Sequence, residues 1–152
     1  MAYHHEQIGR FYVAMLAVAA LMVVAAAVVV GAVGERAPAG FPGFVAALLG
    51  IIIVTFCRLN IDVGATELRW SMTFGWPYGR IPIADIAGAE IVPVTFWMGI
   101  GIHLTLRGWL WNVALGKGVR IRKRDGIAIV LGTDDPEGLL TAIANVRAAD
   151  TP

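Results

Sequence analysis

The stretch that decides the fold is FYVAMLAVAALMVVAAAVVVGAV, residues 11–33, followed after a short break by FPGFVAALLGIIIVTFC, residues 41–57. Neither run contains a charged residue. As a helix the first run is about 34 Å long, enough to cross a hydrocarbon core of roughly 30 Å. The second is about 25 Å long and needs local thinning of the bilayer or snorkelling flanks. The pattern predicts a transmembrane helical hairpin over residues 11–57.

Three alternatives compete with a spanning hairpin. A helix pair buried in a soluble core needs a larger core than a chain of 152 residues offers. A cleaved signal peptide has an apolar region of about 7–15 residues after a basic start, whereas the first run is longer and only Arg10 flanks it. As a third alternative, the second run lies flat in the membrane interface. This is disfavoured, because interfacial helices have one charged face and this run is apolar all round.

Basic residues near the two runs indicate an orientation. Arg10 precedes the first run and Arg58 follows the second, while Arg36 lies between the runs; Arg69 and Arg80 add to the side of the termini. Lys and Arg accumulate on the cytoplasmic side of membrane proteins. We therefore expect a multi-pass protein of the cell membrane, with two spans and with both termini and the domain in the cytoplasm.

The second run contains two overlapping pairs of small residues four positions apart. Gly43 lies four residues before Ala47, and Ala46 four before Gly50. Small residues at this spacing let membrane helices approach closely. The pairs indicate either packing of the two helices within one chain or a contact with another protein.

The rest of the chain forms one small domain, residues 58–152, with residues 1–10 as an N-terminal tail. The whole chain is 58% hydrophobic, with a mean hydropathy of +0.73, too apolar for a soluble domain. Residues 58–152 carry ten lysines or arginines against nine aspartates or glutamates, a balance that gives no nucleic-acid footprint. Cys57 is the only cysteine, so no internal disulfide forms, and it reads as a small buried hydrophobe.

Residues for catalysis are scarce. Ser71 is the only serine, inside a predicted strand with no histidine close in sequence. His4 and His5 are too few for a metal site, and His103 lies in a predicted strand. Zinc-ligand spacing, a phosphate loop and a nucleophile elbow are absent from the sequence. We predict a protein that is not an enzyme and that uses neither metal nor cofactor.

Period-two alternation and turn residues predict about seven strands after the hairpin. Leu68, Trp70, Met72 and Phe74 are expected on one face of a strand, and Asp125-Gly126 is a strong hairpin signal. Two segments, 80–83 and 89–94, are either two strands or one bent strand. The predicted strand segments are 59–63, 67–74, 80–83, 89–94, 101–106, 109–115, 119–124 and 127–132.

A single amphipathic helix is expected to follow the strands. Asp135 suits the N-cap, Pro136 the first helical position, and Glu137 the positive end of the helix dipole. One face of this helix is apolar, formed by Leu139, Leu140, Ile143 and Val146. The pattern predicts an α+β protein: a small barrel or sandwich of strands with the helix closing one open end.

This order of elements resembles a bacterial pleckstrin-homology-like (PH-like) domain. The resemblance is carried by RIPIADIAGAEIV (80–92), by GIGIHL with WLWNV (99–113), and most specifically by VRIRKRDGIAIVLGTDDPEGLLTAI (119–143). It covers residues 59–147. Small membrane-anchored members of the family with one or two N-terminal spans are similar in layout. The resemblance implies a PH-like β-barrel or sandwich closed by a C-terminal helix, and it carries over no catalytic residue.

Two segments of this domain are candidate contact surfaces. Arg120, Arg122 and Arg124 alternate on one strand face, with Lys123 close by. Each basic charge near an anionic leaflet contributes about 1 kcal/mol of binding. The other interpretation is a solvated outer face opposite the core residues Val119, Ile121 and Ile129.

The second candidate is the apolar segment Phe96, Trp97 and Met98 beside glycines. Tryptophan favours the boundary between membrane and water, so this segment rests on the bilayer, packs on the hairpin or belongs to the core. Trp109 and Trp111 share a strand face and are expected in the core.

These features favour a non-catalytic integral membrane protein that presents a PH-like module for contact with a protein or a lipid headgroup. The alternative is a small accessory subunit that contacts a larger membrane complex through its helices. The expected partners are the lipid bilayer, anionic lipid headgroups, and a membrane protein or a second copy of the chain; no nucleic acid is expected.

Overall fold

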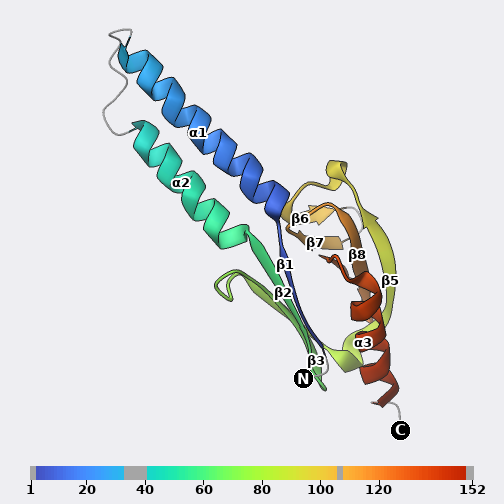
Figure 1. The fold of residues 1–152 in the computed structure, drawn as a ribbon. Coiled ribbons are helices and arrows are strands. Elements are labelled where there is room, and N and C mark those ends of the chain that lie inside the picture. The colour runs from blue at the N-terminus through green and yellow to red at the C-terminus, as the bar shows by residue number, and fades with distance from the viewer. Residues whose placement is uncertain (1–2, 33–40, 106–107, 150–152) are drawn as a thin grey trace.

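The computed structural model describes residues 3–32, 41–105 and 108–149, in which two helices project from one end of a domain made of two sheets (Figure 1). In chain order the elements are β1 (Tyr3–Ile8), α1 (Arg10–Ala32), α2 (Phe41–Phe56), β2 (Arg58–Val63), β3 (Glu67–Met72), β4 (Tyr78–Pro82), the 3-10 turn η1 (Ile83–Asp85), β5 (Ile86–Val94), the 3-10 turn η2 (Phe96–Met98), β6 (Gly101–Thr105), β7 (Gly108–Asn112), β8 (Gly116–Lys123), β9 (Ala128–Gly132) and α3 (Pro136–Ala149).

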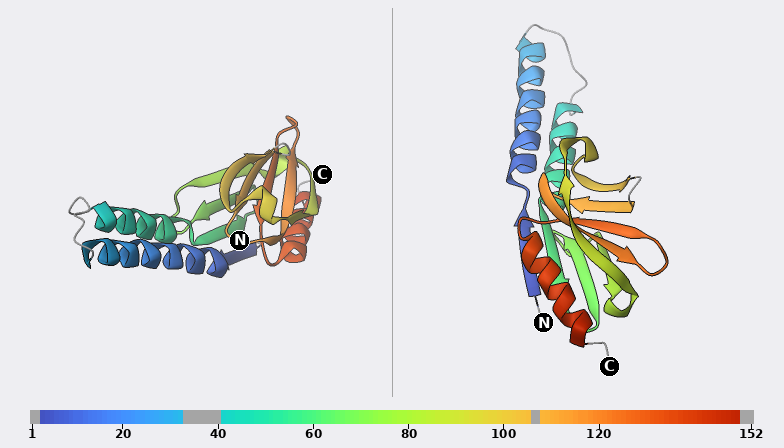
Figure 2. Two further views of the ribbon diagram at one scale, coloured as in Figure 1. Left: turned by 90° about the horizontal axis from the view of Figure 1, so that it is seen from above. Right: turned by 90° about the vertical axis from the view of Figure 1, so that its right-hand side faces the viewer.

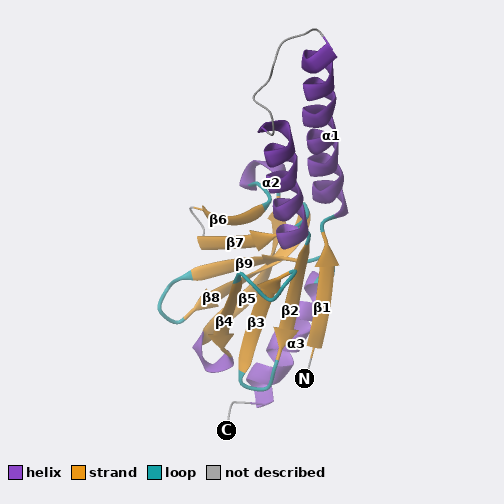
Figure 3. Cartoon of the chain, turned by 90° about the vertical axis from the view of Figure 1, so that its left-hand side faces the viewer, coloured by secondary structure: helices purple, strands orange, loops and turns teal. Residues whose placement is uncertain are grey.

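The strands form two separate sheets. The first has the order β1-β2-β3-β4 and is antiparallel throughout. The second has the order β5-β8-β9-β7-β6, in which only β7 and β9 are parallel. The sheets face each other, and the part of the chain that the structure describes does not close into a barrel (Figures 2 and 3). The α+β class is confirmed, and the two sheets form a sandwich rather than a closed barrel.

Alternation in β2 and β3 explains how the first sheet meets the core. Leu59, Ile61 and Val63 of β2 are fully buried, while the residues between them are half-buried. In β3, Leu68, Trp70 and Met72 are buried in the same way. The prediction that Phe74 shares this face is wrong, because β3 ends at Met72 and the chain turns away, which leaves Phe74 exposed.

The main core lies between the two sheets and is closed by α3. The second sheet contributes residues that include Ile86, Val119, Ile121 and Leu131. The predicted apolar face of α3 packs against them through Leu139, Leu140, Ile143 and Val146. Asp135 caps this helix as expected, since its Oδ1 accepts a 3.0 Å hydrogen bond from the Gly138 N–H.

A second, smaller apolar cluster lies on the other face of the second sheet. It consists of Val92, Val94, Leu110 and Val130, with Met98 of η2 packed against them. The segment after β5 therefore folds back over the sheet. This sheet buries apolar side chains on both faces, although its outer cluster is much the smaller.

The structure has nine strands among its described residues where the sequence predicts about seven. Residues 3–8, assigned to a tail, form β1 and pair with β2 over their whole length. The segments 80–83 and 89–94 belong to two different strands, because η1 lies between β4 and β5 and carries the chain from one sheet to the other. The β8–β9 hairpin at Asp125-Gly126 is confirmed.

Candidate membrane-contact surface

The helices leave the domain at one point, the open end of the β1–β2 pair. Ile8 is paired with Arg58, and beyond this pair the Gly9 N–H donates a 2.8 Å hydrogen bond to the Cys57 carbonyl. α1 begins at the next residue and α2 ends one residue before Cys57. The hairpin is thus the connection between two neighbouring strands. No flexible linker separates the helices from the first sheet (Figure 1).

The two helices expose their apolar side chains. α1 and α2 contain no buried residue. Among the described residues one helix, α1 with 23 residues, is long and apolar enough to cross a membrane; α2 has 16 residues and is shorter. The large apolar side chains that both helices expose are Phe11, Met15, Val18, Leu21, Met22, Val24, Val28, Val29, Phe41, Phe44, Leu48, Ile51 and Val54. The turn between the predicted spans, residues 34–40, lies outside the described residues.

The two glycines of α2, Gly43 and Gly50, are not at a close approach of the two helices. Gly43 and Ala47 are exposed, and Ala46 and Gly50 are half-buried. A Cβ added at Gly43 or Gly50 would meet no atom within 4 Å. The helices run side by side (Figure 3), but the glycines leave room that α1 does not fill.

The predicted segment 96–98 divides between core and surface. Met98 packs into the outer cluster of the second sheet. Trp97 is 92% exposed, and the side chain of Phe96 lies outside the described residues. η2 lies at the end of the domain from which the helices project (Figures 1 and 2).

Of the two neighbouring tryptophans, Trp111 packs against the main core and meets Trp70 edge to face at 5.8 Å. Trp109 is exposed, so the expectation of a core position is wrong for Trp109.

The predicted basic strip on β8 is largely engaged within the domain. Arg120 forms an ion pair with Glu90 (3.0 Å), and Lys123 forms one with Asp125 (2.5 Å). Arg124 donates to the Ala84 carbonyl (2.7 Å). Lys123 lowers the pKa of the Asp125 carboxyl by its hydrogen bond, with help from the Ile127 N–H.

The position of this strip also separates it from the helices. The Gly116 end of β8 is paired with Val94, which leads into η2, whereas Lys123 is paired with Ile86 at the opposite end. The β8–β9 turn projects to one side of the domain, away from the base of the helices (Figure 2). Arg122 is exposed, and the described residues provide no ion pair or hydrogen bond for its side chain.

The sequence indicates a turn at residues 75–79, between β3 and β4, but the exposed aromatic surface at this turn was not predicted. Phe74, Trp76 and Tyr78 are all exposed. Because β3 runs back toward the helices, this turn lies at their end of the first sheet: Met72 is paired with Leu59, the second residue of β2. The signal was GWPYG at residues 75–79, in which turn residues alternate with aromatic ones.

A shallow groove of about 290 Å³ adjoins this turn on the first sheet. Arg69 and Arg80 face each other across β3 and β4 beside it. Arg69 is paired with Glu67, whereas the exposed Arg80 has no ion pair among the described residues. The groove is lined by Asp62, Arg69, Trp70, Ser71, Tyr78, Gly79 and Arg80.

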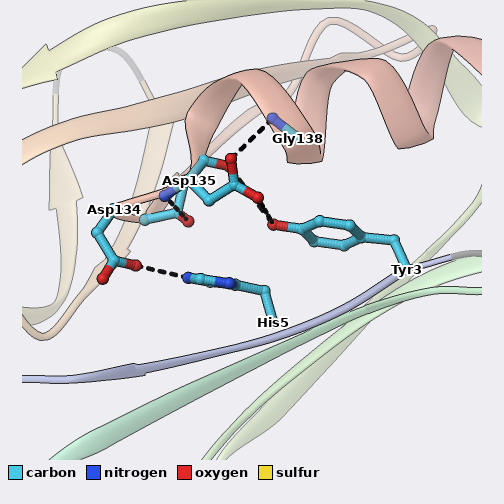
Figure 4. A network of polar contacts seen from close by, with 6 residues as sticks. Tyr3, His5, Asp134, Asp135 and Gly138 are labelled. Atoms are coloured by element: carbon cyan, nitrogen blue, oxygen red, sulfur yellow. Dashed lines mark hydrogen bonds and ion pairs between the residues drawn. The ribbon is translucent and has the colours of Figure 1, made fainter.

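The missed strand β1 is tied to the opposite sheet by polar side chains on one of its faces. The Tyr3 hydroxyl donates to Asp135 Oδ2 (3.0 Å), and His5 Nε2 lies 2.5 Å from Asp134 Oδ1 (Figure 4). The buried Gln7 amide, oriented to satisfy both neighbours, donates to the Gly132 carbonyl and accepts from the Asp134 N–H. We call Tyr3, His5, Gln7 and their partners the polar seam.

The polar seam fixes β1, and with it the start of α1, against the β9–α3 junction. Burial of Tyr3, together with its hydrogen bond to Asp135, raises the pKa of the phenol well above its ordinary value of about 10. The other face of β1 is bound to β2: His4 Nδ1 lies 2.6 Å from Asp62 Oδ1, and Glu6 is paired with Arg58.

Within residues 3–32, 41–105 and 108–149, no group of three or more histidine, cysteine, aspartate or glutamate side chains is placed to hold a metal ion. His103 Nε2 lies 2.7 Å from the Ile100 carbonyl, and Ser71 is paired in register with Asn60 and Tyr78 on the outer side of the first sheet.

No family model matches this chain, and no curated protein matches it in sequence.

Proposed function

We propose that this chain is a non-catalytic integral membrane protein whose α1–α2 hairpin crosses the bilayer twice and presents a PH-like module at the cytoplasmic surface for contact with a protein or a lipid headgroup. The observation that carries the proposal is the insertion of an exposed apolar hairpin between two paired strands, β1 and β2. Because the helices connect directly to the paired strands, the domain moves together with its membrane anchor.

The exposed helices support a location in lipid. Their apolar surface is unfavourable in water by about 25 cal/mol for each Å², and the rest of the described domain covers none of their residues completely. α1 is about 34 Å long and matches a hydrocarbon core of about 30 Å. α2 is about 24 Å long, and the bilayer adapts to it by local thinning.

The arrangement of the strands supports the PH-like module. With the β6–β7 hairpin set aside as an insertion between β5 and β8, the domain has an antiparallel four-stranded sheet, an antiparallel sheet β5-β8-β9, and the closing helix α3. These seven strands and the closing helix are compatible with a PH-like arrangement, but they are not the seven strands that the sequence predicted. They include β1, which lies in the predicted tail, and leave out β6 and β7, which lie in the segment 99–113 that carries part of the resemblance. The β6–β7 hairpin joins the second sheet through the parallel pair β7–β9.

The basic residues at the domain end of the hairpin support the cytoplasmic side. Arg10 begins α1 and Arg58 begins β2, so both lie where the helices leave the domain. A cysteine introduced at Ala65, in a Cys57→Ala background, tests this orientation. A membrane-impermeant maleimide should label it in lysed cells and not in intact cells; labelling of intact cells would place the domain on the outer side.

Purification of the tagged full chain from native membranes tests the interaction role. If the module is the contact surface for a protein, Arg122→Glu should release that co-purifying protein, because Arg122 is the exposed base of the predicted strip for which the described residues provide no ion pair. Substitutions confined to the helices should leave that partner bound. Loss of the partner only on helix substitution would contradict a role for this surface.

The open glycines of α2 favour a second candidate, a small accessory subunit held in a larger membrane complex by its helices. Since α1 leaves the space at Gly43 and Gly50 unfilled, a helix of another protein can approach there. Gly43→Val with Ala47→Val should then reduce the mass of the detergent-solubilised complex. Ala17→Val on the exposed side of α1 is the matched control.

A further inference from the structure

The β3–β4 turn exposes three aromatic side chains within five residues. Phe74 is 70% exposed, and Trp76 and Tyr78 are each 65% exposed. An exposed tryptophan and tyrosine in one turn are unusual for a purely solvated loop, because both residues combine a large apolar ring with one polar group. That combination suits the boundary between lipid and water, where tryptophan and tyrosine are enriched.

The turn is placed against the end of the membrane hairpin. Thr73, its first residue, has its Oγ1 3.5 Å from the Sγ of Cys57, the residue that follows α2. The Met72 N–H bonds to the Pro77 carbonyl and closes the turn (2.9 Å). The aromatic side chains therefore lie beside the point where α2 ends, at the depth at which the chain leaves the bilayer.

A second exposed tryptophan lies at the same end of the domain. Gly9, just before α1, packs against the backbone of Val113. Three residues after Val113, β8 begins at Gly116, which is paired with Val94, the residue that leads into η2. η2, the segment that contains Trp97, thus lies near the helices on the second sheet, as the turn does on the first (Figures 1 and 2). The hairpin has exposed aromatic residues on both sides of its base.

Basic residues follow the aromatic turn at the next level of the sheet. Arg80 lies two residues beyond Tyr78 along β4, about 7 Å farther from the bilayer, and faces Arg69 across the strands. With the aromatic rings at the interface, these side chains reach the phosphates of the headgroup layer. Along the first sheet, the aromatic residues are thus followed by the basic ones. This is the order in which the interfacial layer and the lipid phosphates follow each other in one leaflet.

We propose that the β3–β4 turn is a second membrane-contact element, in which Phe74, Trp76 and Tyr78 lie in the interfacial layer of the leaflet that α1 and α2 enter. The inference rests on the proposed membrane location of the hairpin. The turn and the helix pair together give the domain at least two points of contact with one surface, so the first sheet stands with one end on the bilayer and cannot rotate freely about the helices.

Depth measurements on the full chain in phospholipid vesicles test this proposal. In a Cys57→Ala background, single spin labels are placed at Trp76, at Ala65 in the turn at the other end of β3, and at Val54 in α2. The ratio of accessibility to oxygen over a nickel chelate should be highest at Val54. It should be severalfold higher at Trp76 than at Ala65, because oxygen concentrates in lipid and the chelate in water.

The outcomes separate this inference from the function on which it rests. A lipid-like ratio at Val54 with equal, water-like ratios at Trp76 and Ala65 would overturn the inference and leave the membrane hairpin intact. A label at Trp76 shielded from both reagents would mean that protein covers the turn, which also overturns it. A water-like ratio at Val54 would refute both.

A second measurement uses the emission of the tryptophans themselves and needs no spin label. Brominated phospholipids quench nearby tryptophan, so the quenched fraction of emission should fall in Trp76→Phe relative to the unmodified chain. Trp70→Phe, at a tryptophan buried in the core, is the matched control and should not lower the quenched emission. An unchanged quenched emission in Trp76→Phe would contradict the contact.

Discussion

The two sheets share one core but differ on their outer faces. The first sheet carries polar residues there, including Asp62, Arg69 and Arg80 across neighbouring strands, and its end near the helices is aromatic. The second sheet carries an apolar cluster covered in part by Met98. The outer face of the sheet that continues into the hairpin therefore suits contact with solvent, whereas that of the other sheet is partly covered by a segment of its own chain.

The largest expected effect compares the two clusters at fully buried leucines. Leu131 lies in the main core and Leu110 in the outer cluster, and both are completely buried. Leucine-to-alanine changes in cores cost about 2–5 kcal/mol, depending on how far the site can collapse. We expect Leu131→Ala near the top of that range and Leu110→Ala near the bottom, because a surface cluster can relax.

The free energy of unfolding in detergent micelles, obtained by urea titration, measures this difference. Equal losses in the two variants would mean that the outer cluster is as tightly enclosed as the main core, and the contrast between the sheets would disappear.

The next effect compares a glycine in each sheet. A Cβ at Gly79 of β4 would lie 2.2 Å from Trp70 Cζ2, a buried ring that cannot move aside. A Cβ at Gly88 of β5 would lie 3.4 Å from the mobile end of Arg122. Gly79→Ala should therefore destabilise the protein by about 2 kcal/mol, and Gly88→Ala by less than about 0.5 kcal/mol.

Near-ultraviolet circular dichroism and the free energy of unfolding check both alanine variants. The tryptophan signal should change in Gly79→Ala alone. A mild effect at Gly79 would show that the indole of Trp70 can shift within the core.

A smaller effect concerns the polar seam that joins the sheets. Tyr3→Phe removes the hydrogen bond to Asp135 and should cost about 1–2 kcal/mol. Because the folded state raises the pKa of Tyr3, its contribution is fully present below about pH 10, the ordinary pKa, and is lost as the pH rises above it. The stability difference between the unmodified chain and Tyr3→Phe should shrink in that range.

Thermal unfolding between neutral pH and pH 11 measures this difference. Tyr78→Phe is the control, because Tyr78 is exposed and its hydroxyl should not contribute. If the stability difference between the unmodified chain and Tyr3→Phe stays constant across the range, the raised pKa of Tyr3 does not contribute to it.

The elements that the sequence predicted are those with a strong apolar period. β2 and β3 alternate, the hairpin runs are continuous, and α3 has a cap and an apolar face. In β2, β3 and α3 the buried residues are themselves the signal, whereas in the hairpin the signal is an uninterrupted apolar run that the domain leaves exposed. The two spans, the orientation and the PH-like assignment remain proposals.

The elements that the sequence missed are held by other forces. β1 presents Tyr3, His5 and Gln7 to the opposite sheet, and these bind through hydrogen bonds to residues more than 120 positions away, so no local apolar period marks the strand. The turn at residues 75–79 was predicted, but its exposed aromatic surface was not. In the sequence the alternation of β3 continues to Phe74, and only the end of β3 at Met72 places that side chain outside.

The smallest expected effect compares one ion pair from each sheet. Arg120 and Glu90 lie on neighbouring strands, and the Arg120 side chain is 21% exposed; Arg69 and Glu67 lie two residues apart on β3, and Arg69 is largely exposed. Double-mutant cycles with glutamine should give coupling energies of about 0.5–1 kcal/mol for the first pair and less for the second. Burial decides the order, because water and ions screen the more exposed pair.

In 1 M salt the screening length is roughly 3 Å, so the Arg69–Glu67 coupling should vanish while part of the Arg120–Glu90 coupling persists. The reverse order would mean that the outer face of the second sheet is as open to solvent as that of the first.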